Sequence, residues 1–246
     1  MSKLAVCELI SVGTEILLGD ILNTDAQYLS IELAKLGISV IHQSTVGDNR
    51  ERLLAQLDEA AKRSDIIILS GGLGPTPDDL TKEVCCEFFG KEMFLHEQTV
   101  EKIKKYFSSK GIEMAQNNLK QAMLPKDCVI FPNDNGTAPG MAIEKDGVHI
   151  LVLPGPPREL KPMFQNCAVP YLMQFSDRII VSHNIRTFGI GESSMSERVN
   201  DLFDAQNPTV APYAKDGEAL LRVTAMAKTK EDAESLCEPI IEEIKK

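Results

Sequence analysis

A glycine-rich loop followed by two carboxylates is the part of this sequence best suited to chemistry. Residues 70–79 read S-G-G-L-G-P-T-P-D-D and follow a short apolar run. Glycines accept positive φ angles and close backbone approach, so the N–H groups of such a loop can point at a phosphate. The residues expected to contact a ligand here are Gly71, Gly72, Leu73, Gly74 and Thr76. The structural alternative is a tight turn in which Asp78 and Asp79 face the positive end of a helix.

A second acidic loop, V-G-D-N at 46–49, supplies Asp48. Two carboxylates repel a diphosphate unless a divalent cation lies between them, and hard cations prefer oxygen ligands. Asp48 and Asp79 therefore predict a site for Mg²⁺, or for a transition metal such as Co²⁺ or Mn²⁺. The structural alternative for Asp48 is the N-cap of the next helix. The glycine-rich loop is not a P-loop, because no G-K-[ST] follows and no lysine is available to hold phosphate.

The loop S-V-G-T-E at 11–15 is a further candidate for ligand contacts. Gly13 with Thr14 can shape an oxyanion-binding turn, and Glu15 adds a carboxylate. Asn23, where the next helix is expected to begin, is either a helix cap or a ligand contact.

The loop P-G-P-P-R-E at 154–159 is rigid enough to present an acidic side chain to a pocket. Its candidate contacts are Pro154, Gly155 and Glu159, and the alternative is an ordinary connector. The general base of a hydrolytic reaction stays open among Glu15, Asp78 and Glu159, in that order of preference.

Alternating strands and helices place these loops together. Residues 4–11, 38–46 and 65–70 are typical of strands, and amphipathic helices are expected between them, the first ending at Gly37. This order predicts right-handed βαβ units and a parallel sheet. Ligands of such sheets bind beyond the carboxyl ends of the strands, where the candidate loops lie.

The rest of the chain divides into a continuation of this domain and a second unit. We expect helices at 77–89, 97–109 and 158–165, a strand at 128–131, and a hairpin of strands 141–144 and 148–153. A boundary near 174–177 gives an α/β domain at 1–175 and a small α+β domain at 176–246. The second domain is predicted to hold strands at 178–188 and 219–227, a helix at 193–203, a turn, and a closing helix.

Charge and composition exclude several functions. The 246 residues carry a net charge of −10, and residues 176–246 contain 9 Lys and Arg against 13 Asp and Glu, which disfavours nucleic-acid binding. No apolar stretch is long enough to cross a membrane, and the N-terminus does not resemble a signal peptide. The six cysteines show no C-x-x-C pair and no regular disulfide framework, which is typical of a reducing compartment and predicts a cytoplasmic protein. The four histidines show no metal-ligand spacing.

Together, the segments S-V-G-T-E-I-L-L-G-D-I-L-N-T-D-A, V-G-D-N and S-G-G-L-G-P-T-P-D-D-L-T closely resemble the competence/damage-inducible protein A (CinA) family. The segments N-G-T-A-P-G, L-P-G-P-P-R-E-L-K-P-M and A-P-Y-A-K-D-G-E extend the resemblance to about residue 220. The first ~170 residues also resemble the wider group of molybdopterin-binding domains, the MogA and MoaB proteins. The resemblance places Asp48 and Asp79 on positions tied to Mg²⁺ and nucleotide handling.

The resemblance implies a three-layer α/β domain with a parallel sheet, followed by a small KH-like α+β domain. It also implies a metal-dependent ADP-ribose pyrophosphatase that releases AMP and ribose 5-phosphate. A molybdopterin adenylyltransferase and a non-catalytic nucleotide-binding module are the alternatives. Many members carry a further domain that deamidates nicotinamide mononucleotide, an activity not expected of residues 1–246. The expected partner is a small nucleotide diphosphate rather than nucleic acid or membrane, and the expected assembly is a homodimer.

Overall fold

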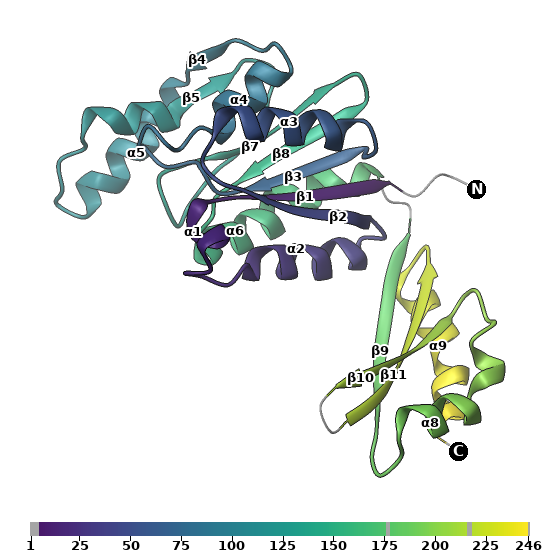
Figure 1. Cartoon of the computed structure of the whole chain (residues 1–246). Coiled ribbons are helices and arrows are strands. Elements are labelled where there is room, and N and C mark those ends of the chain that lie inside the picture. Colours follow the sequence, from purple (N-terminus) through teal and green to yellow (C-terminus); the bar gives the residue numbers. More distant parts are fainter. Residues whose placement is uncertain (1–4, 176–177, 216–217, 246) are drawn as a thin grey trace. The chain divides into compact units, whose positions relative to one another are not determined.

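The computed structural model describes residues 5–175, 178–215 and 218–245. The chain forms two compact units (Figure 1). One contains residues 1–33 and 38–175, and the other contains residues 34–37 and 176–246. The candidate loops all belong to the first unit.

The first unit alternates strands and helices along its first ninety residues, as the sequence pattern predicts. Its elements are β1 (Val6–Val12), α1 (Thr14–Leu18), α2 (Thr24–Lys35), β2 (Ser39–Val46), α3 (Arg50–Ala61), β3 (Ile66–Ser70), α4 (Thr81–Phe88), β4 (Met93–Leu95), α5 (Glu97–Ser109), η1 (Gln116–Ala122), β5 (Met123–Pro125), β6 (Val129–Phe131), β7 (Gly140–Lys145), β8 (Val148–Leu153), α6 (Pro157–Met163), η2 (Phe164–Ala168), α7 (Val169–Leu172) and η3 (Met173–Phe175).

A six-stranded sheet of order β2-β1-β3-β8-β7-β6 forms the centre of this unit. The first four strands are parallel, whereas β7 is antiparallel to both of its neighbours. The predicted hairpin joins β7 to β8, and its turn places Asp146 and Gly147 at φ angles of 53° and 81°. The mostly parallel α/β fold predicted from the sequence is confirmed.

Helices cover both faces of the sheet and give three layers. Helices α3 and α4 lie on one face, and α2 and α6 lie on the other (Figure 1). On the first face, Leu53 and Leu57 of α3 and Val84 of α4 pack against sheet residues such as Ile67 and Val152. The strand β3 is buried along its whole length because both faces are covered.

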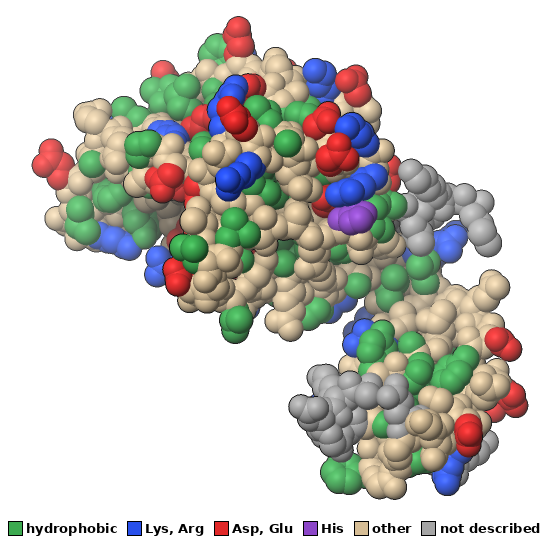
Figure 2. All heavy atoms as spheres, viewed as in Figure 1, with side chains coloured by type: hydrophobic (Ala, Val, Ile, Leu, Met, Phe, Trp, Pro, Cys, Tyr) green, Lys and Arg blue, Asp and Glu red, His purple; other side chains and the backbone are tan. Residues whose placement is uncertain are grey.

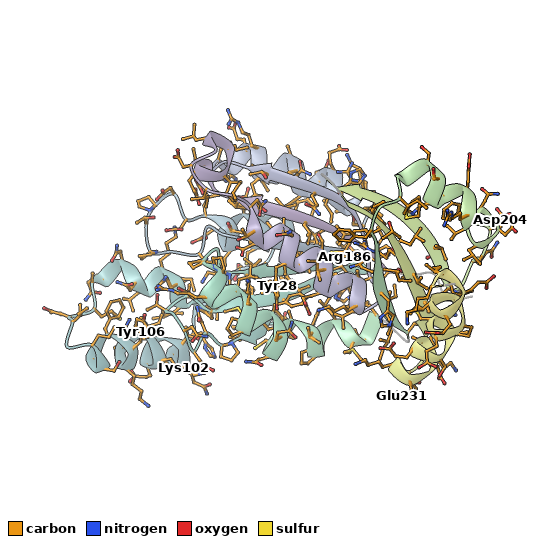
Figure 3. All side chains as sticks on the ribbon, turned by 90° about the horizontal axis from the view of Figure 1, so that it is seen from below. Tyr28, Lys102, Tyr106, Arg186, Asp204 and Glu231 are labelled. Atoms are coloured by element: carbon orange, nitrogen blue, oxygen red, sulfur yellow. The ribbon has the colours of Figure 1, made fainter. Side chains whose placement is uncertain are left out.

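On the opposite face, α2 and the helical segment after β8 lie side by side. Tyr28, labelled in Figure 3, packs edge-on against Phe164, with 6.0 Å between the ring centroids. Gln165 Nε2 donates a hydrogen bond to the Tyr28 hydroxyl. The helix expected at 158–165 in fact continues through Phe175 as α6, η2, α7 and η3, with Pro162 inside α6.

The helix predicted at 77–89 is wrong at its start, because α4 begins at Thr81. Side-chain hydrogen bonds hold the preceding residues in a turn: Asp79 accepts from the backbone N–H of Thr76, and Lys120 donates to the carbonyls of Thr76 and Asp79. Pro77, Asp78 and Asp79 therefore lie in a loop rather than in the first helical turn.

The second unit contains β9 (Ile179–Thr187), α8 (Glu192–Arg198), η4 (Asn200–Leu202), β10 (Thr209–Lys215), β11 (Glu218–Ala227) and α9 (Lys230–Ile244). Its antiparallel sheet has the order β10-β11-β9, and Val223, Ala225, Ala233 and Cys237 are at its core. The small α+β unit is as predicted, apart from two elements. The helix expected at 193–203 ends at Arg198, and β10 replaces the expected turn. Proline is tolerated in β10 because this strand lies at the sheet edge.

Acidic and basic side chains lie close together over α3 and α4 on the face shown in Figure 2. An ion pair between Arg50 and Glu87 joins these two helices.

Within the described ranges, no helix is long and apolar enough to span a bilayer.

Candidate active site

The candidate loops meet at a pocket of about 520 Å³ beyond the carboxyl ends of β1, β2, β3 and β8. Such a volume suits a nucleotide-sized ligand. Most of the residues predicted from the sequence line it: Gly13, Glu15, Asn23, Asp48, Gly71, Gly72, Leu73, Gly74, Asp78, Asp79, Pro154, Gly155 and Glu159. The other two, Thr14 and Thr76, hold the carboxylates in place.

Asp48 is fixed by Thr14, the first residue of α1. Its Oδ2 accepts hydrogen bonds from the backbone N–H of Thr14 at 2.9 Å and from the Thr14 hydroxyl at 2.8 Å. The backbone N–H of Asp48 donates in return to Thr14 Oγ1 at 3.2 Å. The N-cap alternative for Asp48 is wrong, because Asn49 caps α3 through a bond from the backbone N–H of Arg52.

Asp79 is held by a threonine in the same way. Its Oδ2 accepts from the backbone N–H of Thr76 at 3.0 Å and from the Thr76 hydroxyl. The Thr76 hydroxyl, the Asp78 backbone and the charge of Lys120 lower the pKa of the neighbouring Asp78, in that order of effect. Both site loops thus use one threonine to orient one carboxylate.

Lys120 contacts the backbone of the glycine-rich loop from elsewhere in the chain. Its Nζ donates to the carbonyl oxygens of Thr76, at 2.8 Å, and of Asp79. It comes from η1, about forty residues away along the chain, so no local spacing could reveal it. It is not among the residues that line the pocket, and its role here is to fix the loop.

The glycines of the loop are required by close packing. At Gly71 and Gly72 the φ angles are +101° and +65°, and a Cβ would lie 2.1 Å from Val12 O and 2.2 Å from Thr81 Oγ1, respectively. A Cβ on Gly74 would lie 2.3 Å from Asp79 Oδ2. Only glycine therefore lets the loop approach both β1 and its own carboxylate.

Asn23 is a helix cap, which is one of the two roles left open by the sequence. Its Oδ1 accepts from the backbone N–H of Ala26, which caps α2, and its Nδ2 donates to Ser11 Oγ at 2.9 Å. It also lines the pocket. The cap explains why α2 begins at Thr24.

The first turn of α6, which follows β8, brings Glu159 to the pocket, where only 9% of the residue is exposed. Glu159 Oε2 accepts from Asn133 Nδ2 at 2.9 Å. A Cβ on Gly136 would lie 2.0 Å from the same oxygen, so the N-G-T-A-P-G segment packs tightly against this carboxylate. These contacts favour a positioning role for Glu159.

The two threonine-held carboxylates suit a hard divalent cation. Each uses Oδ2 for its threonine, and across the described residues Oδ1 of either aspartate makes no hydrogen bond. Mg²⁺ is commonly held by one or two carboxylates and completes its shell with water and substrate phosphate. In the described part of the chain, no group of three or more His, Cys, Asp or Glu is arranged to hold a metal.

Several pocket residues were not predicted. Two of them, Asp25 and Gln121, are 8% and 3% exposed, and each has a buried oxygen, Asp25 Oδ1 and Gln121 Oε1, without a hydrogen-bond partner. Burial raises the pKa of Asp25 to about 6, against the opposing charge of Lys161. The sequence signal for Asp25 is a carboxylate in the first turn after the Asn23 cap, a position that helix formation alone also favours. The other unpredicted lining residues include Ile16, Ile21, Leu22, Thr24, Thr137 and Ala138.

A second pocket, of about 500 Å³, lies beside α5 and the 132–139 loop. Lys102 and Tyr106, labelled in Figure 3, line it, and Thr137 lines both pockets. It contains none of the residues predicted as site residues.

Sequence comparison identifies both units. A family described as "Probable molybdopterin binding domain" matches residues 8–174, and one described as "Damage-inducible protein CinA KH domain" matches residues 182–246. CinA-like proteins of Dictyoglomus thermophilum and Dictyoglomus turgidum are each 55% identical over 98% of this chain. The crystal structure of the protein CinA from Thermoplasma acidophilum, with unknown function, is similar with a TM-score of 0.62 and 31% identity, and the match covers 68% of this chain and 98% of that one.

The match covers 59% of the length of each of these Dictyoglomus relatives, so the chain spans about three fifths of the curated relatives it matches. Within this span the similarity includes the α/β domain with the pocket and the small α+β domain. The chain therefore belongs to the CinA family.

Proposed function

We propose that this protein hydrolyses the diphosphate of ADP-ribose to AMP and ribose 5-phosphate with a divalent metal ion. The observation that carries the proposal is the meeting of Asp48, Asp79 and the Gly71–Gly74 loop at one pocket of about 520 Å³. A diphosphate needs donors for its oxygens and a cation between it and the carboxylates, and this arrangement offers backbone donors together with two carboxylates able to hold such a cation.

The protein's own groups have separate tasks in the proposed reaction. Backbone N–H groups of the glycine loop beyond Gly71 would bind phosphate oxygens, because the N–H of Gly71 itself donates to the carbonyl of Leu153. Asp48 and Asp79 would hold the metal ion. When bound, such an ion lowers the pKa of a water ligand and offsets the charge that develops on phosphate. The pocket walls would orient the diphosphate for attack by water.

The bond changes balance with water as the only co-substrate. The water oxygen forms a bond to one phosphorus, and the bond from that phosphorus to the bridging oxygen breaks. The bridging oxygen leaves with the second phosphate, and the water proton passes to a general base. Among the three candidates, Asp78 has a lowered pKa and Glu159 is bound by Asn133, which favours Glu15.

A second candidate function follows from the family match over residues 8–174, whose description names molybdopterin. In that case the same pocket would transfer an adenylyl group from ATP to the phosphate of a pterin and release diphosphate. A module that binds nucleotides without turnover is the third possibility.

Chromatographic product analysis tests these functions. Protein is incubated with ADP-ribose and Mg²⁺, Mn²⁺ or Co²⁺, beside the variants Asp79→Asn and Asp58→Asn. Asp58 lies on α3 in an exposed ion pair with Lys62 and is the matched control. We expect equal amounts of AMP and ribose 5-phosphate with metal, loss of both products in Asp79→Asn, and normal turnover in Asp58→Asn.

Three other outcomes would contradict the proposed site or indicate one of the two alternative functions. Metal-dependent turnover that survives in Asp79→Asn would contradict the proposed site. No AMP with any metal, together with saturable thermal stabilisation by ADP-ribose, would indicate a binding module. Diphosphate release from ATP only in the presence of a pterin phosphate would indicate the transferase.

A further inference from the structure

Two buried oxygen atoms of the pocket lack partners in the protein. Asp25 Oδ1 and Gln121 Oε1 make no hydrogen bond within the described part of the chain, although each residue is more than nine-tenths buried. An unpaired buried acceptor is costly, and native proteins rarely leave one without a water, ligand or functional reason. Both residues line the pocket, and their two oxygens are covered in this structure, so a ligand can supply the missing donors when it displaces the groups that cover them.

The oxygen assignment of Gln121 follows from its neighbour. Gln121 Nε2 donates to the carbonyl oxygen of Leu73. Because a carbonyl oxygen can only accept, the amide nitrogen must face it, and the unpartnered atom is the acceptor Oε1. Burial raises the pKa of Asp25 to about 6, so near neutral pH this side chain is also an acceptor. Both groups therefore select for hydrogen-bond donors.

The two acceptors come from opposite sides of the sheet edge. Asp25 is in the first turn of α2, which covers one face of the sheet. Gln121 is tied to α4 on the other face, because Lys82 Nζ donates to its carbonyl at 2.6 Å. The glycine loop at the end of β3 lies in the layer between them (Figure 1).

We infer that Asp25 and Gln121 are specificity-determining residues, which accept hydrogen bonds from hydroxyl groups of the two sugars that flank the bound diphosphate. The inference rests on the proposed function for its ligand class, a diphosphate with a sugar on each side. A carboxylate that accepts from ribose hydroxyls is a known mode of nucleotide recognition on α/β sheets.

The experiment measures binding without turnover. The probes are the α,β-methylene analogues of ADP-ribose and of ADP, in which CH₂ replaces the bridging oxygen, titrated calorimetrically with Mg²⁺ present. The variants are Asp25→Ala, Asp25→Asn and Gln121→Met. Ser64→Ala is the matched control, because Ser64 Oγ is also buried without a partner but lies outside the residues that line the pocket.

We expect Asp25→Ala and Gln121→Met each to weaken binding of the ADP-ribose analogue on the order of tenfold, the usual effect of one lost hydrogen bond to ligand. Only one of them should weaken binding of the ADP analogue, which has a single sugar. Asp25→Asn keeps an acceptor oxygen and should recover part of the affinity. Ser64→Ala should bind as the parent does.

A purely structural role gives a different pattern. If Asp25 has only a structural role, Asp25→Ala should lower the melting temperature and leave the affinity unchanged. If Asp25 binds ligand, removal of its unpaired buried carboxylate should leave the melting temperature equal or higher. A variant that binds the ADP-ribose analogue within twofold of the parent overturns the assignment of its residue. Turnover of ADP-ribose by the parent is measured separately. If the parent turns over ADP-ribose and the variants bind with unchanged affinity, only this inference is refuted. If the variants bind more weakly but the parent shows no turnover, only the proposed hydrolysis is refuted.

Discussion

Asp48 and Thr14, 34 residues apart in the chain, form a closed set of three hydrogen bonds. Thr14 donates to Asp48 Oδ2 through its backbone N–H and its hydroxyl, and the Asp48 backbone N–H donates to the same hydroxyl oxygen. The contact joins the start of α1, which follows β1, to the loop after β2, and these two strands are parallel neighbours. It fixes one oxygen of the carboxylate and leaves the other for a ligand.

Replacement of Thr14 should therefore disturb metal use before it disturbs the fold. Thr14→Val removes the hydroxyl, so Asp48 loses one of its two orienting donors, and we expect kcat/KM for ADP-ribose to fall roughly tenfold with a higher metal requirement. Thr14→Ser keeps the hydroxyl and should retain most activity. Metal titrations of turnover for both variants check this, and equal activation curves would contradict it.

Gly74 should not tolerate a methyl group. In Gly74→Ala the new Cβ would meet Asp79 Oδ2 at 2.3 Å, so either the loop or the carboxylate must shift. A misplaced ligand group commonly costs about a hundredfold in rate, and we expect a loss of this order in kcat/KM with the fold retained. Steady-state kinetics and circular dichroism measure the two effects.

The matched control for Gly74 is Gly191→Ala. Gly191 has an ordinary φ of −75°, and nothing lies within 4 Å of a Cβ built there. This variant should behave as the parent does. Parent-like kinetics in Gly74→Ala as well would show that the position of Asp79 Oδ2 is not critical.

The site could be predicted largely because its residues follow strands. Asp48 and the Gly71–Gly74 loop come directly after β2 and β3, and parallel strands present their carboxyl ends at one edge. The order of elements alone therefore brings them together. The same reasoning located Gly13 and Pro154 after β1 and β8.

Residues that reach the site across the chain could not be predicted in this way. Lys120 and Gln121 belong to η1, a short segment without amphipathic periodicity, and only tertiary packing brings them to the glycine loop. The start of α4 was misplaced for a related reason. Local propensity favours a helix from Pro77, but the bonds of Lys120 and Asp79 hold residues 76–79 in a turn.

Lys120 should be important for the order of this loop. Lys120→Met keeps the length of the side chain but removes the donors to the carbonyls of Thr76 and Asp79. Hydrogen bonds from a charged group contribute about 1.5–3 kcal/mol each, so the loop should open more readily. We expect faster amide hydrogen exchange over residues 74–80 and a clear fall in turnover.

Lys104→Met is the control for Lys120, because Lys104 is an exposed residue of α5 paired with Glu101. It should leave hydrogen exchange in the loop unchanged. If Lys120→Met also leaves exchange at residues 74–80 unchanged, other contacts hold the loop.

The pH dependence of stability should reveal Asp25. Because burial raises its pKa from 3.8 to about 6 in the folded protein, the folded state binds a proton more readily than the unfolded state between these values. The contribution of Asp25 to the free energy of unfolding therefore falls as pH rises from 4 to 6. Above pH 6 the ionised carboxylate destabilises the folded state by a constant amount. Lys161 faces this carboxylate and opposes the shift, while Glu15 and Glu159 line the same pocket.

Asp25→Asn isolates this effect, because the other titrating groups are common to parent and variant. The free energy of unfolding of Asp25→Asn, relative to that of the parent, should be roughly 1–2 kcal/mol greater at pH 7.5 than at pH 4.5. One pKa unit corresponds to about 1.36 kcal/mol. Urea unfolding of both proteins at the two pH values gives the difference directly. A difference that is the same at both values would mean that Asp25 titrates at its ordinary pKa, with solvent or a bound cation already satisfying the carboxylate. A pH-dependent gain would instead mean that the protein maintains an unpaired acceptor in the pocket at the expense of its own stability, as expected for a residue that binds ligand.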